Sequence, residues 1–108
     1  MSAVTSIAPR ELARRLAAGE RFVLLDVREP DELAICRLPG ALAIPMGEVP
    51  RRLEELDRAA AIVCVCHHGI RSANVAGLLA RSGFTHVLNL SGGVERWALE
   101  VDPAMARY

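Results

Sequence analysis

One short segment of the chain combines a thiol, a glycine and a permanent positive charge. Cys66 directly follows an apolar run, Gly69 stands three positions later, and Arg71 and Ser72 come next. If this segment curls around the sulfur, successive backbone N–H groups and the dipole of a following helix converge on it and stabilise a thiolate, the nucleophilic form of cysteine. Gly69 permits a backbone conformation that a β-carbon would obstruct, and the guanidinium fork of Arg71 suits an oxyanion. Residues 66–72, the nucleophile loop, are therefore predicted to carry a reactive cysteine and to bind an anion.

The nucleophile loop also contains His67, His68 and Ile70. Adjacent histidines in a tight loop point in different directions, and no third ligand is evident, so the sequence predicts no metal site. We expect the two histidine side chains to line the mouth of the loop, although exposed loop polarity explains them equally well. One cysteine after an apolar strand is ordinarily an inert buried thiol, and it is the glycine, arginine and serine after it that favour a nucleophile.

Cys36 and Cys64 bring the number of cysteines to three, an odd number in a chain without a recognisable secretion signal, which argues against a disulfide framework. Cys64 lies two positions before Cys66, so its side chain is expected on the same face of the strand but deeper, in the core. For Cys36 we expect a packed small side chain. A redox role for either cysteine stays open.

The nucleophile loop must be positioned by the elements on either side of it. Residues 61–65 are an uninterrupted apolar run of strand length, typical of a central strand buried on both faces. A helix is predicted after the loop, with Ser72 as a candidate N-cap and Gly83 just beyond its end. Asp26 and Arg28 follow another apolar run, and we expect them to pair with each other or with nearby charges; contact with the nucleophile loop is the alternative.

The remaining segments alternate in the same way. The sequence predicts helices from Pro9 to Gly19, from Pro30 and from about Val94 to Val101, and strands over 22–27, 41–44 and 86–90. Val49, Leu53 and Leu56 lie at helical spacing and predict a further helix with one apolar stripe. Trp97 is expected to be a packing residue. This alternation favours an α/β fold, with a small, mostly parallel sheet of about five strands and helices on both faces. Ligands are expected beyond the carboxyl ends of the strands, where Cys66 lies.

Length and composition limit the possible functions. The 108 residues are 52% hydrophobic, enough for the core of a single domain over residues 1–108. Thirteen basic residues balance thirteen acidic ones, so no large positive field recruits nucleic acid or an anionic membrane. The first residues lack a basic segment followed by an apolar one, and no apolar run approaches the roughly 18 residues of a membrane span. We therefore expect a cytoplasmic protein without a nucleic-acid or membrane partner.

The pattern Cys-x-x-Gly-x-Arg-Ser after a buried strand resembles the active-site loop of rhodanese-type sulfurtransferases. Other segments agree with that family in order: residues 25–29 resemble its LDVRE signature, residues 38–41 with 44–45 resemble its HIPGA..IP segment, and residues 90–93 with Trp97 resemble its closing L-x-G-G-x-x-x-W. Arg37 stands where the family commonly has histidine before the Pro-Gly turn. The tail from Trp97 to Tyr108 is similar to that of rhodanese domains fused to ubiquitin-like-protein activating enzymes of molybdopterin or thiamine sulfur pathways.

The resemblance implies a sulfurtransferase that moves sulfane sulfur from a donor such as thiosulfate to a thiophilic acceptor through a persulfide on Cys66. In such a mechanism the backbone amides of residues 67–71 hold the persulfide, and Arg71 orients the donor or stabilises the leaving anion. No metal or organic cofactor is required. The partners implied are small sulfur donors and acceptors, together with a sulfur-carrier protein or a cysteine desulfurase.

Two alternative functions stay open. Rhodanese-like domains also serve as non-catalytic binding or regulatory modules, because a fold does not by itself prove a function. Such modules commonly lack the cysteine that this chain has. Phosphatases and arsenate reductases of the same fold also use an anion loop from cysteine to arginine, but resemblance to them would require a loop one residue longer than the six residues from Cys66 through Arg71.

Overall fold

The computed structural model describes residues 4–108 and contains a five-stranded sheet in which every neighbouring pair of strands is parallel. In sheet order the strands are β1 (Thr5–Ile7), β5 (His86–Leu90), β4 (Ala61–Val65), β2 (Val23–Asp26) and β3 (Leu42–Ala43). The predicted α/β class and the predicted sheet of about five strands are confirmed. The three-residue strand β1 was not among the predicted segments, because it is too short to show an apolar period.

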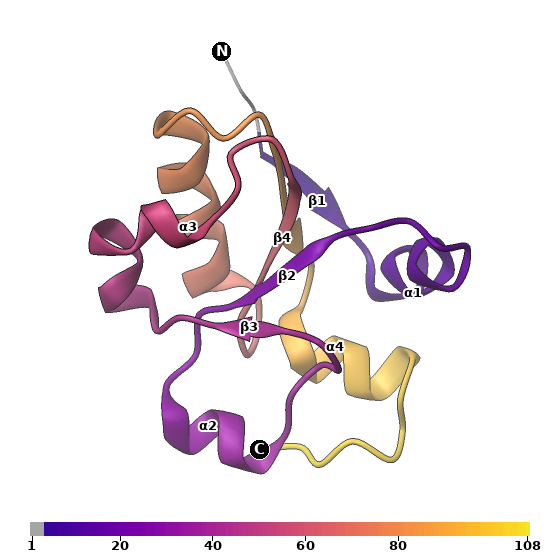
Figure 1. The fold of residues 1–108 in the computed structure, drawn as a ribbon. Coiled ribbons are helices and arrows are strands. Elements are labelled where there is room, and N and C mark those ends of the chain that lie inside the picture. The colour runs from indigo at the N-terminus through magenta and orange to yellow at the C-terminus, as the bar shows by residue number, and fades with distance from the viewer. Residues whose placement is uncertain (1–3) are drawn as a thin grey trace.

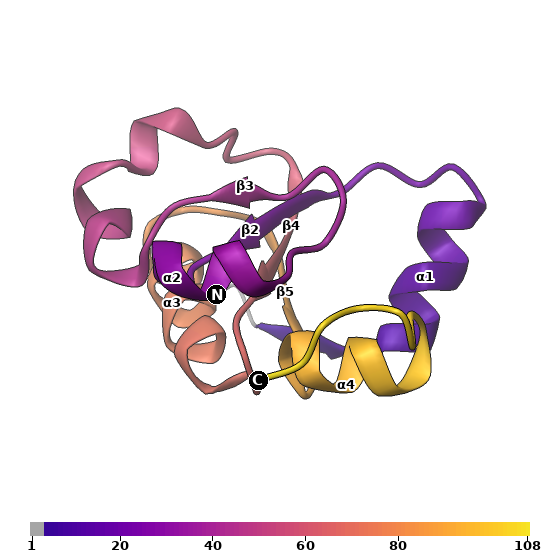
Figure 2. The same ribbon diagram turned by 90° about the horizontal axis from the view of Figure 1, so that it is seen from below.

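Helices cover both faces of this sheet, as the alternating sequence pattern predicts. They are α1 (Pro9–Ala17), α2 (Pro30–Ile35), α3 (Ile70–Arg81) and α4 (Gly93–Glu100). Figure 1 shows α3 on one side of the sheet and α1 and α4 on the other, and Figure 2 shows the same two layers after a quarter turn. Among residues 4–108, no helix has both the length and the apolar character needed to cross a membrane.

The two faces of the central strand β4 enter two separate core clusters. Ile62 and Cys64 point toward α3, whereas Val63 and Val65 point toward α1 and α4. This alternation follows from the period of two along a strand, and a strand covered on both faces needs an uninterrupted apolar sequence. Trp97 belongs to the cluster between the sheet and α4, which confirms its predicted packing role.

The stretch from residue 46 to residue 56 differs from the prediction. It forms two 3-10 turns, η1 (Met46–Arg51) and η2 (Leu53–Glu55), and no regular helix. Pro50 lies inside the first turn, and proline has no N–H to donate to a helical hydrogen bond. The apolar side chains still reach the core, since Val49 is fully buried.

The parallel arrangement brings the carboxyl ends of the strands to one edge of the sheet. There β4 leads into Cys66, β2 leads into Arg28, and β5 leads through a turn into α4. The N–H of Val27 donates to the carbonyl of Val65 at 2.9 Å, which continues the ladder between β2 and β4 to this edge. The tail after α4 runs back to the same end of the molecule and ends beside α2 (Figure 1).

Candidate active site

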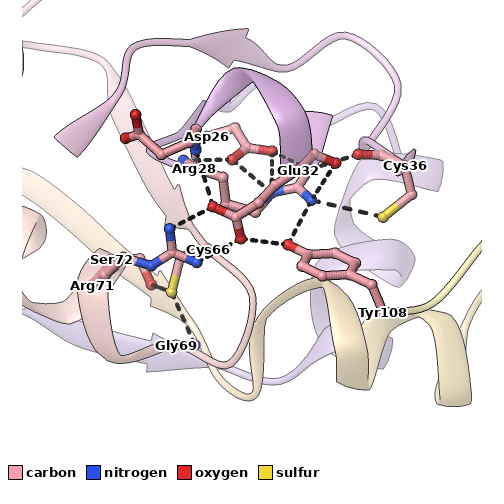
Figure 3. Close-up of polar contacts among 10 residues, drawn as sticks. Asp26, Arg28, Glu32, Cys36, Cys66, Gly69, Arg71, Ser72 and Tyr108 are labelled. Atoms are coloured by element: carbon pink, nitrogen blue, oxygen red, sulfur yellow. Dashed lines mark hydrogen bonds and ion pairs between the residues drawn. The ribbon is translucent and has the colours of Figure 1, made fainter. Parts of the chain in front are cut away.

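The sulfur of Cys66 lies at the carboxyl end of β4, in the centre of the sheet. The residue is 1% exposed. The N–H of Gly69 donates to its Sγ at 3.1 Å, and the hydroxyl of Ser72 donates to the same atom at 3.2 Å (Figure 3). Two donors converging on one sulfur form an arrangement that stabilises negative charge on it.

Ser72 reaches this sulfur because α3 begins earlier than predicted. The helix starts at Ile70, and its N-cap is Gly69 in a left-handed conformation with φ of 100°. The predicted N-cap role of Ser72 is therefore wrong: the residue is the third of the helix, fully buried, with its hydroxyl turned back to Cys66. Glycine suits the cap position because a positive φ of this size costs other residues energy.

Asn89 holds the loop from the neighbouring strand β5. Its Nδ2 donates to the carbonyl oxygen of Gly69 at 3.1 Å. Gly69 is therefore held by a side chain of the sheet while its own N–H donates to Sγ of Cys66. The Oδ1 of Asn89 has no hydrogen-bond partner among residues 4–108. Sequence reasoning missed this residue, although a polar side chain in a buried apolar strand was a usable signal.

The N-terminus of α4 packs against the other side of the loop. The N–H of Val94 donates to the carbonyl of Cys66 at 2.9 Å, and the N–H of Glu95 donates to that of His67 at 3.1 Å. Gly93 allows this approach, because its φ is 60° and a β-carbon there would overlap the backbone carbonyls of Cys66 and His67. The first two carbonyls of the loop, those of Cys66 and His67, thus accept hydrogen bonds from the N-terminus of α4.

Arg71 forms a two-pronged ion pair with Glu32 of α2. The N–O distances are 2.6 and 2.7 Å. The hydrogen bonds from Arg71 lower the pKa of Glu32 to about 2, and the same contacts raise the pKa of Arg71. Asp26, for which contact with the nucleophile loop was the alternative expectation, is instead bound to Arg28. Sequence reasoning missed Glu32, because the helix dipole alone accounts for an acidic residue in the first turn of a helix.

Tyr108 joins Glu32 to Arg28, the buried arginine that follows β2. Its hydroxyl donates to Oε2 of Glu32 at 2.7 Å and accepts from Nη1 of Arg28 at 3.0 Å (Figure 3). Burial raises the pKa of Tyr108 to about 12, so its hydroxyl keeps its proton at neutral pH. The residues Asp26, Arg28, Tyr108, Glu32 and Arg71 thereby form one continuous series of contacts, the charged chain.

Arg28 is the buried member of the charged chain. It has no exposed surface, and its guanidinium pairs with the carboxylate of Asp26 at 2.8 Å. It also donates to the carbonyl oxygen of Cys36 at 2.7 Å and lies 3.7 Å from the Sγ of that residue. Asp26 and Arg28 therefore pair with each other, as expected, and attach α2 to the sheet. Cys36 itself is partly buried against the core cluster on the α4 side.

The histidines of the loop lie near the tail. The ring of His67 stacks on that of Tyr108, with centroids 3.8 Å apart and planes at 12°. The ring of His68 lies tilted against the ring of His67, also with centroids 3.8 Å apart. Burial and the nearby charge of His68 lower the pKa of His67, and its Nε2 has no hydrogen-bond partner within the described part of the chain. Ile70 is 75% exposed, so it is available to a ligand at the surface.

Cys64 lies in the core, as predicted. It has no exposed surface and faces the same core cluster as Cys66, one layer deeper in the sheet. Burial raises the pKa of the Cys64 thiol to about 12. Cys64 is therefore a protonated thiol at neutral pH, and it is a poor nucleophile.

Residues 8–100 match the family model of the rhodanese-like domain. The chain is 37% identical over 103 residues to a sulfurtransferase of Allochromatium vinosum, covering 95% of this chain and 96% of that protein. It is 34% identical over 106 residues to the probable adenylyltransferase/sulfurtransferase MoeZ of Mycobacterium tuberculosis, covering 96% of this chain but 27% of that protein. The solved structure of a human single-domain sulfurtransferase matches with a TM-score of 0.82 at 27% identity, covering 91% of this chain and 98% of the human one.

Proposed function

The chain belongs to the rhodanese-like domain family, and from that membership we propose that it transfers sulfane sulfur from thiosulfate to a thiophilic acceptor through a persulfide on Cys66. Relatives named as sulfurtransferases support sulfurtransferase activity in general. The observation that carries the finer proposal is the convergence of the Gly69 N–H and the Ser72 hydroxyl on Sγ of Cys66. These donors stabilise the attacking thiolate and, afterwards, the persulfide.

The proposed reaction has two half-reactions. In the first, the thiolate of Cys66 attacks the outer sulfur of thiosulfate. A new S–S bond forms, the S–S bond of the donor breaks, and sulfite leaves with the electron pair. In the second, a thiophile such as cyanide attacks the outer sulfur of the persulfide, and the thiolate of Cys66 leaves.

The residues around Cys66 have separate roles in this proposal. Arg71, at the start of α3, binds the negatively charged donor and the departing sulfite. Cys66 is 1% exposed, so its sulfur is shielded from bulk water before the donor arrives. As protein partner we propose a sulfur-carrier protein or a cysteine desulfurase; similarity to an adenylyltransferase/sulfurtransferase supports a sulfur-related partner in general.

Mass spectrometry of the reduced protein after incubation with thiosulfate tests the proposal. We expect one additional sulfur on the peptide that contains Cys66, and its loss on addition of cyanide. The variant Cys66→Ser should do neither, whereas Cys36→Ser should behave as the unmodified chain. Sulfur that is still transferred in Cys66→Ser, through Cys36 or Cys64, would contradict the assignment.

A comparison of substrates tests the phosphatase alternative. The six-residue loop is expected to favour sulfur chemistry, so thiosulfate turnover should exceed hydrolysis of an aryl phosphate by orders of magnitude. Comparable rates would overturn the proposal. Failure to react with either substrate would instead favour the non-catalytic module.

A further inference from the structure

Tyr108 contacts the candidate site in three places, and the proposed sulfur transfer gives it no role. Resting on that proposed function, we propose that Tyr108 is a positioning residue for donor specificity. Its hydroxyl competes with Arg71 for Oε2 of Glu32 and so weakens the pairing between Glu32 and Arg71. Arg71 therefore keeps more of its attraction for an anionic donor. Tyr108 touches neither Cys66 nor Arg71 through a hydrogen bond and acts through Glu32.

The first step of the argument concerns the charge of Arg71. Its only ion-pair partner among residues 4–108 is Glu32, and the two-pronged geometry offsets much of the guanidinium charge. Arg71 is the cation of the nucleophile loop. An anionic donor that approaches Cys66 therefore competes with Glu32 for the same cation.

The second step concerns the charge of Glu32. Its Oε2 accepts from Arg71 and also from the hydroxyl of Tyr108, which in turn accepts from Arg28. Two donors that share one carboxylate oxygen weaken each other's hydrogen bonds, because each is stabilised by the same negative charge. The buried cation that donates to the Tyr108 hydroxyl makes this hydroxyl a stronger competitor. Tyr108 thus competes with Arg71 for Glu32, in the direction that frees Arg71.

The third step is that Glu32 stays in place without Tyr108. Its Oε1 also accepts from the N–H of Glu29, the N-cap residue of α2, at 3.1 Å, and this contact does not involve the tail. Loss of the hydroxyl should therefore change the charge that Glu32 presents to Arg71, and should leave its position unchanged.

The tail is built to hold the phenol at this point. The ring stacks on His67, Arg107 pairs with Glu95 of α4 at 2.6 Å, and Met105 packs against the core cluster on the α4 side. Substitution Tyr108→Phe removes the hydroxyl and keeps the stacked ring, so it separates the charge effect from detachment of the tail.

Two alkylating reagents of nearly the same shape measure the effect at Cys66 itself. Iodoacetate is an anion and iodoacetamide is neutral, and with both the sulfur displaces iodide. The ratio of their rates at the peptide that contains Cys66, followed by mass spectrometry, reports the positive charge near the sulfur. Peptide mapping separates this reaction from that of the partly exposed Cys36.

We expect Tyr108→Phe to lower the iodoacetate-to-iodoacetamide ratio by about two- to fivefold, the size of part of a hydrogen bond to a charged group. Glu32→Gln should change the ratio in the opposite direction, because it removes the competing charge. In steady-state kinetics, Tyr108→Phe should raise KM for thiosulfate by a similar factor and leave kcat nearly unchanged. Glu54→Gln is the charge control, since its side chain is 89% exposed and lies outside the charged chain.

Equal changes with both reagents would indicate a purely structural role for Tyr108 and would overturn the inference, as would an increased ratio in Tyr108→Phe. Alkylation involves no sulfur transfer, so the two proposals fail separately. A shifted ratio without persulfide formation would reject the proposed function alone. Persulfide formation with an unshifted ratio would reject the role of Tyr108 alone.

Discussion

The nucleophile loop and the charged chain meet at the same site but are built in different ways. The donors to Sγ of Cys66 come from three and six positions further along the chain. The hydrogen bonds of the charged chain beyond β2 join residues 39, 76 and 80 positions apart. The environment of the sulfur is therefore a local property of a strand, a turn and a helix, whereas the charge that meets a donor depends on the complete fold.

The two regions also differ in the forces that hold them. Apart from Arg71, which belongs to both regions, the loop is held by hydrogen bonds from uncharged donors and by the close approach of α4, and such contacts respond weakly to salt. The charged chain is held mainly by ion pairs, which weaken when a carboxylate is protonated or when salt screens the charges. Variants that change one region and spare the other can test this division.

The largest expected effect is on the close approach of α4 to the nucleophile loop. Gly93→Ala should lower the free energy of unfolding by about 3 kcal/mol, because the added β-carbon combines a strained φ with overlap onto the loop carbonyls. Denaturant unfolding measures the loss. Gly19→Ala is the matched control: its φ is 89° with nothing within 4 Å of the added carbon, so it should cost only about 1 kcal/mol. Equal losses would show that the approach of α4 is not tight.

The second effect is on the end of the charged chain nearest the sulfur. Arg71→Ala should reduce kcat/KM for thiosulfate by roughly ten- to a hundredfold, the equivalent of about 1.5–3 kcal/mol for a charge-assisted contact. Its unfolding should change little, since the pair with Glu32 is partly exposed. Arg52→Ala is a close control, because that side chain is 31% exposed, against 32% for Arg71, and also forms two-pronged hydrogen bonds to glutamate. A lower free energy of unfolding, together with equal losses of reaction rate for anionic and neutral reagents, would show that Arg71 is not a residue of the active site.

The different construction of the two regions explains what the sequence could predict. The strand, the turn and the thiol are adjacent in sequence, so the order of residues alone places Cys66 at the edge of the sheet. Ser72 was also found, although as a helix cap, because its real contact depends on where the turn ends. Whether these residues catalyse sulfur transfer stays a prediction.

The charged chain could not be predicted in the same way. Its contacts need the positions of α2 and of the tail relative to β2, and no local pattern encodes them. Glu32 resembles an ordinary acid in the first turn of a helix, and Tyr108 lies in an irregular segment beyond Pro103. The same limitation applies to β1, which is recognisable only by its pairing with β5.

A smaller effect is expected from the hydroxyl next to the sulfur. Ser72→Ala should slow alkylation of Cys66 by iodoacetamide at neutral pH by roughly two- to tenfold. A hydrogen bond to the thiolate is worth about 1.5–3 kcal/mol, and about half of this is offset because a less stabilised thiolate is a stronger nucleophile. The ratio of iodoacetate to iodoacetamide should not change, because Arg71 is untouched. Ser82→Ala removes a comparable hydroxyl that donates to the carbonyl of Leu78 at the end of α3, and should leave both rates unchanged. A shifted ratio in Ser72→Ala would show that the two regions are not separable.

The smallest effect is a dependence of stability on acid pH that belongs to the charged chain alone. The pKa of Glu32 falls from 4.5 to about 2 on folding, first because Arg71 donates hydrogen bonds to it and further because the Glu29 N–H and the Tyr108 hydroxyl donate as well. A depressed pKa means that the unfolded chain takes up a proton first as the pH falls. The stabilisation by Glu32 is therefore complete above about pH 4.5 and is lost progressively toward pH 2. Since Arg71 is partly exposed, we expect this contribution to be below about 1 kcal/mol.

Glu32→Gln should abolish this contribution, so that the difference in unfolding free energy between the variant and the unmodified chain shrinks as the pH falls through this window. Glu55→Gln, which removes an exposed partner of Arg52, should give a smaller change over the same range. A constant difference between pH 4.5 and pH 2 would show that Glu32 is not held by its ion pair, and would weaken the contrast between a neutral loop and a charged chain.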